Sequence, residues 1–478
     1  MSTAFAKSVP GRTAVLPSRP SRRAADMLPA NLLRAAPARL PELSELDVIR
    51  HFTELSHKNF SVDAQFYPLG SCTMKYNPRF TEHIAALPGF TRLHPLMAQL
   101  KGAGAYTQGA LEVMWDMERL LCEITGMDAF TLHPMAGAHG ELTGVMLIAA
   151  YHKDRGNKKT KMIVPDSAHG TNPASAALAG YDIVNIPSKD GIVDPAALDA
   201  VLDDEVAGLM MTCPNTLGLF ENHLPEIVEK LRAVDALLYY DGANANAILG
   251  KMRVGDVGFD VIHFNLHKTF ATPHGGGGPG SGPVGVSARL TPYLPVSRVR
   301  KEQDGAYRLD YDFPKSIGYV APFYGNFGVM LKAYAYILRL GAAGLTRVSE
   351  YAVLNANYLR KKLEAVLEIP YNRICLHEFV ATPGDSPAHA LDIAKALIDN
   401  NIHPPTVYFP LIVKEALMIE PTETESKQTL DTFIGVMESI MRTASDDIDA
   451  LHAAPVNMPV RRLDETAAAR NMVITDNV

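Results

Sequence analysis

The sequence predicts an α/β protein whose main domain contains a mostly parallel β-sheet. Short apolar runs suited to buried strands occur at 161–165, 207–211, 236–240 and 261–264. The stretches between them are long enough to hold helices, which indicates successive βαβ units. Each run is followed by polar or titratable residues mixed with small ones, a pattern typical of parallel strands that end at a ligand site. We therefore expect these four strand exits to meet at one edge of the sheet.

The composition is that of a globular protein large enough for two domains. Of the 478 residues, 47% are hydrophobic and 20% are charged, which is ordinary for soluble proteins. No run approaches the roughly 18 apolar residues of a membrane span. The formal net charge is −7 and the pI is near 6.2, which argues against a nucleic-acid surface. We expect neither a membrane nor a nucleic-acid partner.

The four cysteines are scattered along the chain and form no CxxC pair or His/Cys cluster. This pattern suits a reducing cytoplasm and predicts neither a disulfide framework nor a metal site.

The N-terminal segment is basic and rich in proline. Seven lysines and arginines between Lys7 and Arg39 are accompanied only by Asp26, which raises the possibility of an organellar transit peptide. Six prolines between Pro10 and Pro41 would break the amphipathic helix that such a peptide forms. A structured arm that wraps on another chain is therefore the favoured interpretation.

Helical patterns flank the predicted sheet on the N-terminal side. Apolar residues from Val48 to Leu55 and from Leu111 to Ile124 recur at helical spacing, and Gly126 ends the second helix. Between them, the segment Phe66–Pro78 is full of turn formers. We predict an N-terminal arm with a lead-in helix over 1–90.

Beyond the sheet, we predict a large domain over 91–330, a smaller α+β domain over 331–450 and a tail over 451–478. In the smaller domain, His377–Thr382 and Ala416–Pro421 resemble strands, and Leu430 to Met441 carries helical periodicity. Thr422, with Glu425 three residues later, predicts a capping box at the start of that helix.

Lys268 stands out because it follows the fourth apolar run and precedes the glycines 275–278. A lysine so placed could bind phosphate as a point charge or act as a nucleophile that forms a Schiff base. The GxxxxGK[ST] spacing of a P-loop is missing, since the lysine comes before the glycines. The choice between phosphate binding and Schiff-base formation therefore depends on the residues at the other strand exits.

Those exits supply what a pyridoxal-phosphate site needs. Asp241 ends the third run and could pair with a ring nitrogen, and Ala243 is small enough to let the ring approach. His169 follows the first run and offers a plane for stacking. Each feature alone has an ordinary structural explanation, but their order favours the cofactor site.

A phosphate site is predicted in the stretch His133–Gly144. Its small residues precede the apolar helical run Val145–Ala150, and bare N–H groups at a helix start bind anions. His267, beside the lysine, could add a donor.

Five stretches identify a family resemblance: "GSCTMKYNP", "SAHGTNPAS", "DGANANA", "NLHKTFATPHGGGGPG" and "IEPTETE". With them the chain resembles the P-protein of the glycine cleavage system, glycine dehydrogenase (decarboxylating), in particular the pyridoxal-carrying second subunit of the two-subunit bacterial form. The resemblance runs from about Lys7 to about residue 460.

The resemblance implies a fold-type I pyridoxal-phosphate enzyme with the architecture of aspartate aminotransferase. It implies that Lys268 holds the cofactor, that Asp241 pairs with the ring nitrogen, and that His169 and Ala243 lie on opposite ring faces. The phosphate would be bound by Ala136, Gly137 and Ala138 together with His267.

The implied activity is that of glycine dehydrogenase (aminomethyl-transferring), an oxidoreductase. Glycine would lose CO2, and its aminomethyl group would pass to the lipoyl arm of the H-protein. The implied assembly is a cytoplasmic heterotetramer with two copies of P-protein subunit 1. The alternatives are another fold-type I enzyme, such as an amino-acid decarboxylase or a cysteine desulfurase, or a non-catalytic scaffold subunit of the same fold.

Overall fold

The computed structural model describes residues 3–14, 21–36, 38–100, 103–273, 278 and 280–474. The chain divides into two compact units. One is Val62–Ala454, and the other combines Met1–Ser61 with Pro455–Val478. The domain boundaries predicted after residues 90, 330 and 450 stay predictions.

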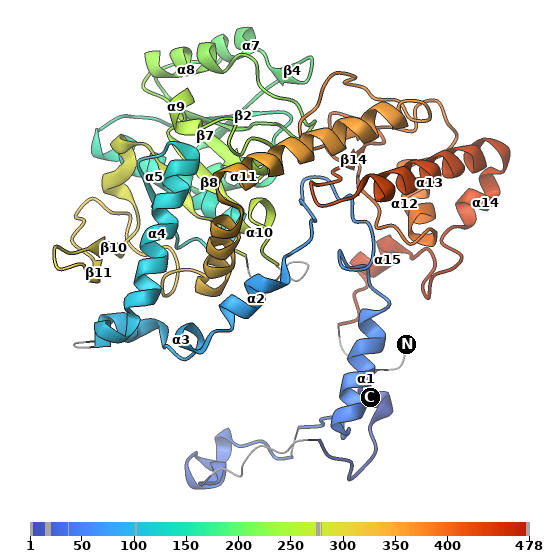
Figure 1. Ribbon diagram of the computed structural model, residues 1–478, viewed down its shortest axis with the longest axis horizontal. Helices are drawn as coiled ribbons and strands as arrows, with labels where there is room; N and C mark the ends of the chain where they lie inside the picture. The colour runs from blue at the N-terminus through green and yellow to red at the C-terminus, as the bar shows by residue number, and fades with distance from the viewer. Residues whose placement is uncertain are drawn as a thin grey trace. The chain divides into compact units, whose positions relative to one another are not determined.

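The larger unit is built on a seven-stranded sheet with the order β1-β9-β8-β7-β6-β2-β3 (Figure 1). The strands are β1 (Ala129–Thr131), β2 (Lys161–Pro165), β3 (Asp182–Ile186), β6 (Val206–Thr212), β7 (Leu237–Gly242), β8 (Val261–Phe264) and β9 (Val284–Val286). Neighbours from β3 to β8 are parallel, and β9 is antiparallel to β8 and β1. The prediction of a mostly parallel sheet is confirmed, and the four predicted strands are β2, β6, β7 and β8.

Helices precede and connect these strands. They are α2 (Arg79–Ala85), α3 (Pro88–Thr91), α4 (Gln108–Thr125), α5 (Gly137–Asp154), α6 (Thr171–Leu178), α7 (Pro195–Asp199), α8 (Leu224–Ala233), α9 (Val254–Val257) and α10 (Leu266–Thr269). As predicted, α4 ends at Gly126, whose φ of 74° is the left-handed conformation that glycine adopts without strain. Two short ribbons, β4 (Ser188–Lys189) with β5 (Ile192–Val193) and β10 (Arg298–Lys301) with β11 (Tyr307–Asp310), complete this part.

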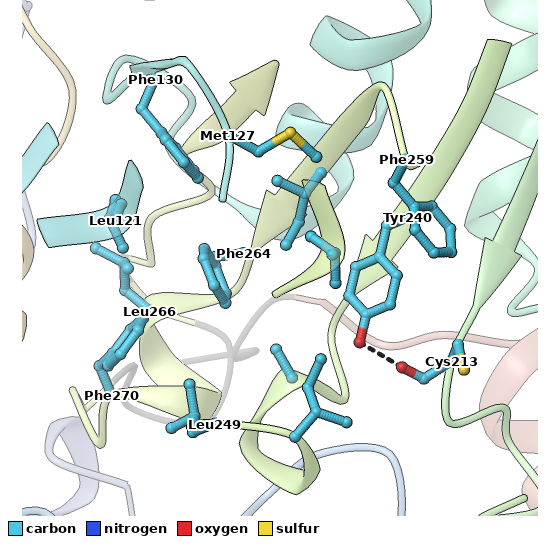
Figure 2. Close-up of a cluster of buried hydrophobic side chains, with 14 of the residues drawn as sticks. Leu121, Met127, Phe130, Cys213, Tyr240, Leu249, Phe259, Phe264, Leu266 and Phe270 are labelled. Carbon is cyan, nitrogen blue, oxygen red and sulfur yellow. Dashed lines mark hydrogen bonds between the residues drawn. The ribbon is translucent and has the colours of Figure 1, made fainter. Parts of the chain in front are cut away.

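The core under the sheet fixes the turn that carries Lys268. Figure 2 shows Phe264, Leu266 and Phe270 in this core, around the short helix α10. The rings of Phe264 and Phe270 meet edge to face with centroids 5.3 Å apart, and both side chains are essentially inaccessible to solvent. Because apolar anchors flank Lys268 on both sides, its backbone position is determined by core packing.

The C-terminal part of this unit has its own hydrophobic core. It contains the sheet β12-β14-β13, formed by β12 (Phe379–Ala381), β13 (Thr406–Val407) and β14 (Leu417–Ile419), with α11 (Phe327–Leu363), α12 (Ala390–Asp399), α13 (Lys427–Asp446) and α14 (Ile448–Ala453). The two strand-like stretches and the late helix of the sequence correspond to β12, β14 and α13.

The predicted capping box at Thr422 is wrong. The helix α13 begins at Lys427, and its N-cap is Ser426, whose hydroxyl accepts a hydrogen bond from the Thr429 N–H. Thr422 has φ of 64°, and its hydroxyl accepts a bond from the N–H of Thr424. The short-range hydroxyl turn at Thr422 therefore replaces the cap.

The smaller unit contains α1 (Glu45–Ser56), capped reciprocally by Ser44 and Asp47, and α15 (Glu465–Arg470). The arm before α1 is tied to it by the ion pairs Lys7–Glu54 at 3.2 Å and Arg12–Asp47 at 3.0 Å. On α1, Leu46, Ile49 and Phe52 are each more than half exposed. Throughout the described ranges, no helix is long and apolar enough to cross a lipid bilayer.

Candidate active site

A cavity of about 240 Å³ lies at the carboxyl ends of β6, β7 and β8. The sequence-predicted residues that line it are Gly137, Ala138, His169, Asp241, Ala243, His267 and Lys268. Ala136 is the N-cap residue of α5 and is not among the described residues of the lining. The strand exits therefore meet at one edge of the sheet, as expected. The predicted glycine loop falls mostly on residues 274–277 and 279, which lie outside the described residues.

Asp241 is held as a buried carboxylate at the end of β7. It is 2% exposed, its Oδ1 accepts the Ala243 N–H at 3.0 Å, and its Oδ2 accepts the Thr212 hydroxyl at 3.3 Å. Nε2 of His263 lies 3.3 Å from Oδ1. Burial favours the neutral acid, but His263, the Ala243 N–H and Lys268 outweigh it and lower the pKa of Asp241. Asp241 is therefore ionised at neutral pH.

Glu141 is a second carboxyl group in this cavity, and sequence reasoning missed it. Burial and then the negative charge of Asp241 raise the pKa of Glu141 to about 8, so this acid is protonated at neutral pH. Its Oε2 is buried without a hydrogen-bond partner, and its Oε1 lies 4.0 Å from Nε2 of His263. One carboxyl group of the cavity is charged and the other is neutral.

Three glycines in α5 explain how Glu141 reaches this position. A Cβ on Gly144 would lie 2.3 Å from Cε2 of Tyr239, and one on Gly140 would lie 2.7 Å from the Gly282 carbonyl oxygen. A Cβ on Gly137 would lie 2.4 Å from Oδ1 of Asn265. The helix therefore packs directly on the sheet and its flanking loop. The spacing Gly137, Gly140, Gly144 was the sequence signal that could have identified this face.

His169 lies in the turn after β2. Its Nδ1 is 2.9 Å from the Thr171 hydroxyl, and its ring meets Phe409 edge to face at 5.7 Å. Burial and then the charge of Lys268 lower the pKa of His169. The ring is therefore a neutral plane at the cavity wall.

Further polar groups line the cavity without having been predicted. They are Ser71, Thr171, Thr212, Thr216, Asn244 and Asn265. Ser71 belongs to a segment far away in sequence, and Thr212 and Thr216 lie at the exit of β6, where no site residue was predicted. The others stand within two residues of predicted ones. In the described lining there is no arginine.

The cavity fits a pyridoxal-phosphate group on its own chemistry. It offers an amine in Lys268, an ionised carboxylate in Asp241, and the N-terminus of the eighteen-residue helix α5 at Gly137 and Ala138. Oδ1 of Asn265 is buried there and has no hydrogen-bond partner. Unpaired buried polar atoms at such a place are expected where a polar ligand completes them.

Comparisons with known proteins find related sequences over most of the chain. Residues 139–277 match the class-V aminotransferase family, and residues 348–462 match the glycine dehydrogenase C-terminal domain. A protein of Caldanaerobacter subterraneus named probable glycine dehydrogenase (decarboxylating) subunit 2 is 60% identical over 456 residues, covering 94% of this chain and 92% of the relative. The chain belongs to the glycine dehydrogenase (decarboxylating) subunit 2 family. A relative of the same name from Listeria welshimeri is 54% identical, and the match covers 99% of this chain and 98% of the relative.

Solved structures place this glycine dehydrogenase family in the expected fold. A glycine decarboxylase (P-protein) in inhibitor-bound form has a TM-score of 0.73 at 20% identity, covering 87% of this chain and 93% of the other. A glutamate decarboxylase from Lactobacillus brevis has a TM-score of 0.64 at 13% identity, covering 89% and 97%. The fold is that of the fold-type I enzymes, and pyridoxal 5′-phosphate is their cofactor.

Proposed function

We propose that this chain decarboxylates glycine within the glycine cleavage system and passes the aminomethyl group to the lipoyl arm of the H-protein. The observation that carries the proposal is the convergence of Lys268, ionised Asp241 and the start of α5 on one cavity, in a chain 60% identical to a named family member. When bound, pyridoxal phosphate supplies an electron sink for the pair released as CO2 leaves.

The side chains have separate tasks in this proposal. Lys268 would hold the cofactor covalently through its side-chain amine. Asp241 keeps a proton on the ring nitrogen, because an ionised buried carboxylate stabilises the protonated base beside it. The neutral ring of His169 stacks on one face of the cofactor and Ala243 leaves room at the other. Gly137 and Ala138, with Ala136 and His267 next to them, receive the phosphate.

The lining suits the loss of a carboxylate. A bidentate arginine would bind the carboxylate of the substrate strongly before it leaves, and binding of that kind stabilises the ground state as well as the transition state. The described lining offers neutral hydroxyl and amide groups instead, on Ser71, Thr216 and Asn244. The carboxylate can therefore be oriented without being held by a cation.

A cysteine desulfurase is the strongest rival, and one from Escherichia coli shares the fold with a TM-score of 0.60 at 13% identity. That chemistry needs a reactive thiolate. Cys213 and Cys375 are buried. Cys72 is the cysteine near the cavity, but burial raises its pKa, which opposes thiolate formation at neutral pH.

The family name implies a partner, subunit 1. We propose a cytoplasmic heterotetramer with two copies of each subunit. The exposed side chains Leu46, Ile49 and Phe52 support this, because they lie three residues apart on one face of α1 and an exposed apolar face of this kind marks a contact surface.

The reaction is tested with carboxyl-labelled glycine, subunit 1 and lipoylated H-protein. We expect labelled CO2 together with an aminomethyl group on the H-protein, detected by mass spectrometry. In a parallel assay with cysteine we expect no sulfide. Sulfide release without glycine decarboxylation would favour the desulfurase alternative, and neither product would favour a scaffold subunit.

A further inference from the structure

Three stretches of the sequence that carry no predicted site residue meet beside the cavity. They are "GSCTMKYNP" (70–78), "HEFVAT" (377–382) and "IEPTETE" (419–425). The Ser71 N–H donates to Glu378 Oε2 at 2.7 Å. Thr73 donates to Glu420 twice, from its N–H at 3.0 Å and from its hydroxyl at 2.7 Å. Two buried glutamates therefore hold one loop.

We call residues 69–75 the Ser71 loop. Its backbone is strained at two non-glycine residues, Ser71 with φ of 63° and Thr73 with φ of 50°. Such conformations persist only where the surroundings hold them. The two strained residues are the same two whose N–H groups are bound by Glu378 and Glu420, so the glutamates hold the loop where it would otherwise relax.

The loop is part of the cavity wall. Ser71 lines the cavity together with Lys268 and Asn244. Oε1 of Glu378 lies 3.5 Å from Nδ2 of Asn244, so this glutamate contacts two lining residues at once. Farther along the loop, Nζ of Lys75 donates to Oε1 of Glu423 at 2.7 Å and to the carbonyl oxygen of Thr269 at 2.9 Å. Thr269 is the residue that follows Lys268.

The two glutamates carry less than two negative charges. Both are fully inaccessible to solvent, and one ligand atom from each lies within 4.8 Å of the other and of His377. Across the described ranges no lysine or arginine forms an ion pair with either. Burial raises the pKa of Glu420 to about 7, and burial followed by the charge of Glu420 raises that of Glu378 well above its usual range.

None of the other titratable groups that face the two glutamates places a positive charge in contact with them. Burial lowers the pKa of His377 to about 3, so its ring is neutral. Lys268 acts through space, and Cys72 and Glu423 add no cation. At neutral pH the pair therefore retains at least one proton, which lowers the cost of burying two adjacent carboxyl groups.

We propose that Glu378 and Glu420 are positioning residues, whose hydrogen bonds to Ser71 and Thr73 hold Ser71 against the substrate side of the cavity. The inference rests on the proposed function, since it treats glycine as the substrate. A protonated glutamate and a glutamine can both accept the N–H of the loop through one oxygen, so amide replacements preserve the loop and truncations release it.

The test compares E378A and E420A with E378Q and E420Q in the complex with subunit 1. Glycine affinity is read from the change it causes in the visible band of the bound cofactor. We expect the alanine variants to bind glycine roughly 10-fold or more weakly, because small displacements of positioning groups have large effects. The glutamine variants should stay within about 3-fold of wild type, and cofactor affinity should change by less than about 3-fold in all four.

Glu415→Gln is the matched control. Glu415 lies in the same C-terminal part and its carboxylate accepts the Ala390 N–H, so this variant should bind glycine as wild type does. Wild-type glycine affinity in E378A and E420A, or equal losses in the glutamine and alanine variants, would overturn the proposal.

A second measurement covers the case in which the alanine variants do not fold. Amide hydrogen exchange in the wild-type protein without glycine should find the Ser71 and Thr73 N–H groups at least about 100-fold slower than in an unstructured chain. Unprotected amides at both residues would overturn the proposal. Because no glycine is present, this result is independent of whether glycine is the substrate.

Discussion

Two carboxyl groups of the cavity differ in charge although they lie close together. Asp241 receives two hydrogen bonds and faces His263, and these contacts keep it ionised. Oε2 of Glu141 is buried without a hydrogen-bond donor. Burial and the negative charge of Asp241 raise the pKa of Glu141, so this group keeps its proton. Environments that separate two pKa values in this way assign separate roles to chemically similar groups. In the proposed mechanism, this difference leaves one negative charge for the ring nitrogen of the cofactor.

Asp241→Asn should retain the cofactor and slow glycine decarboxylation by roughly 100-fold or more, the size of effect seen when a preorganised charge partner is lost. The amide cannot hold the ring nitrogen protonated, and the ring becomes a poorer electron sink. Rates of CO2 release at saturating glycine measure this, alongside the visible absorbance that reports bound cofactor. A near-native rate would mean that another group protonates the ring.

Glu141→Gln should change how the stability of the cofactor-free protein depends on pH. The pKa of Glu141 is about 8 in the folded protein, above the ordinary value of 4.5. The folded state then binds the proton more tightly than the unfolded state, so this group makes stability fall as pH rises from about 4.5 to 8, by up to roughly 1.4 kcal/mol per pH unit. The amide does not titrate, so the variant loses that contribution. Urea unfolding at pH 6, 7 and 8 compares the slopes, and equal slopes would rule out the assignment.

At the scale of single residues, the sequence identified those whose chemistry is visible from their position at a strand end. Lys268, Asp241 and His169 each follow an apolar run, and all three line the cavity. Their assigned roles stay predictions. Glu141 and Ser71 were missed. Glu141 projects from a helix whose packed face is indicated only by the glycine spacing 137, 140 and 144, and Ser71 comes from a loop 197 positions before Lys268. Only the tertiary fold brings them together.

Among the elements, α5 matters most for the site, because its glycines let it pack directly on β7 and β8. Gly144→Ala would place a Cβ 2.3 Å from the ring of Tyr239. That ring cannot withdraw easily, since it is fully buried and its hydroxyl lies 2.8 Å from Nδ1 of His263. We expect a destabilisation of roughly 1–3 kcal/mol, measured by denaturant unfolding, with weaker cofactor binding.

Gly435→Ala in α13 is the control for this substitution. A Cβ there meets nothing within 4 Å, so the change should stabilise the protein by about 0.5–1 kcal/mol through helix propensity alone. If both variants shifted stability in the same direction and by the same amount, close packing at Gly144 would not be the cause.

The elements that were predicted are those with strong patterns. The buried strands β2, β6, β7 and β8 are continuous apolar runs, which parallel sheets require. The strand β3 was not predicted, because it is a partly exposed edge strand without such a run. The strand β9 was not predicted either, since it has three residues, Val284–Val286, in a stretch rich in glycine and proline. The predicted cap of α13 at Thr422 was wrong because the Thr422 hydroxyl accepts a local hydrogen bond from the Thr424 N–H, and Ser426 caps the helix instead.

On the scale of the whole molecule, the exposed face of α1 gives a test of assembly. Phe52→Ser should weaken binding to subunit 1 by at least about 10-fold, since truncating a buried aromatic anchor typically costs more than 1 kcal/mol. Arg50→Ala, an exposed residue outside that apolar stripe, is the control and should assemble normally. Sedimentation of mixtures with subunit 1 measures both. A fully active stable monomer would refute the heterotetramer.

The proposed glycine decarboxylation depends on the amine of Lys268. Glycine-dependent exchange of labelled bicarbonate into the carboxyl group, measured with subunit 1 and the H-protein present, tests this dependence. The wild type should exchange label, and so should Lys251→Ala, in which a half-exposed surface lysine is removed. Lys268→Ala and Lys268→Arg should lose the exchange and the visible band of the covalently attached cofactor together, since neither side chain can form the bond. Exchange at the wild-type rate in either Lys268 variant would show that the reaction does not depend on Lys268.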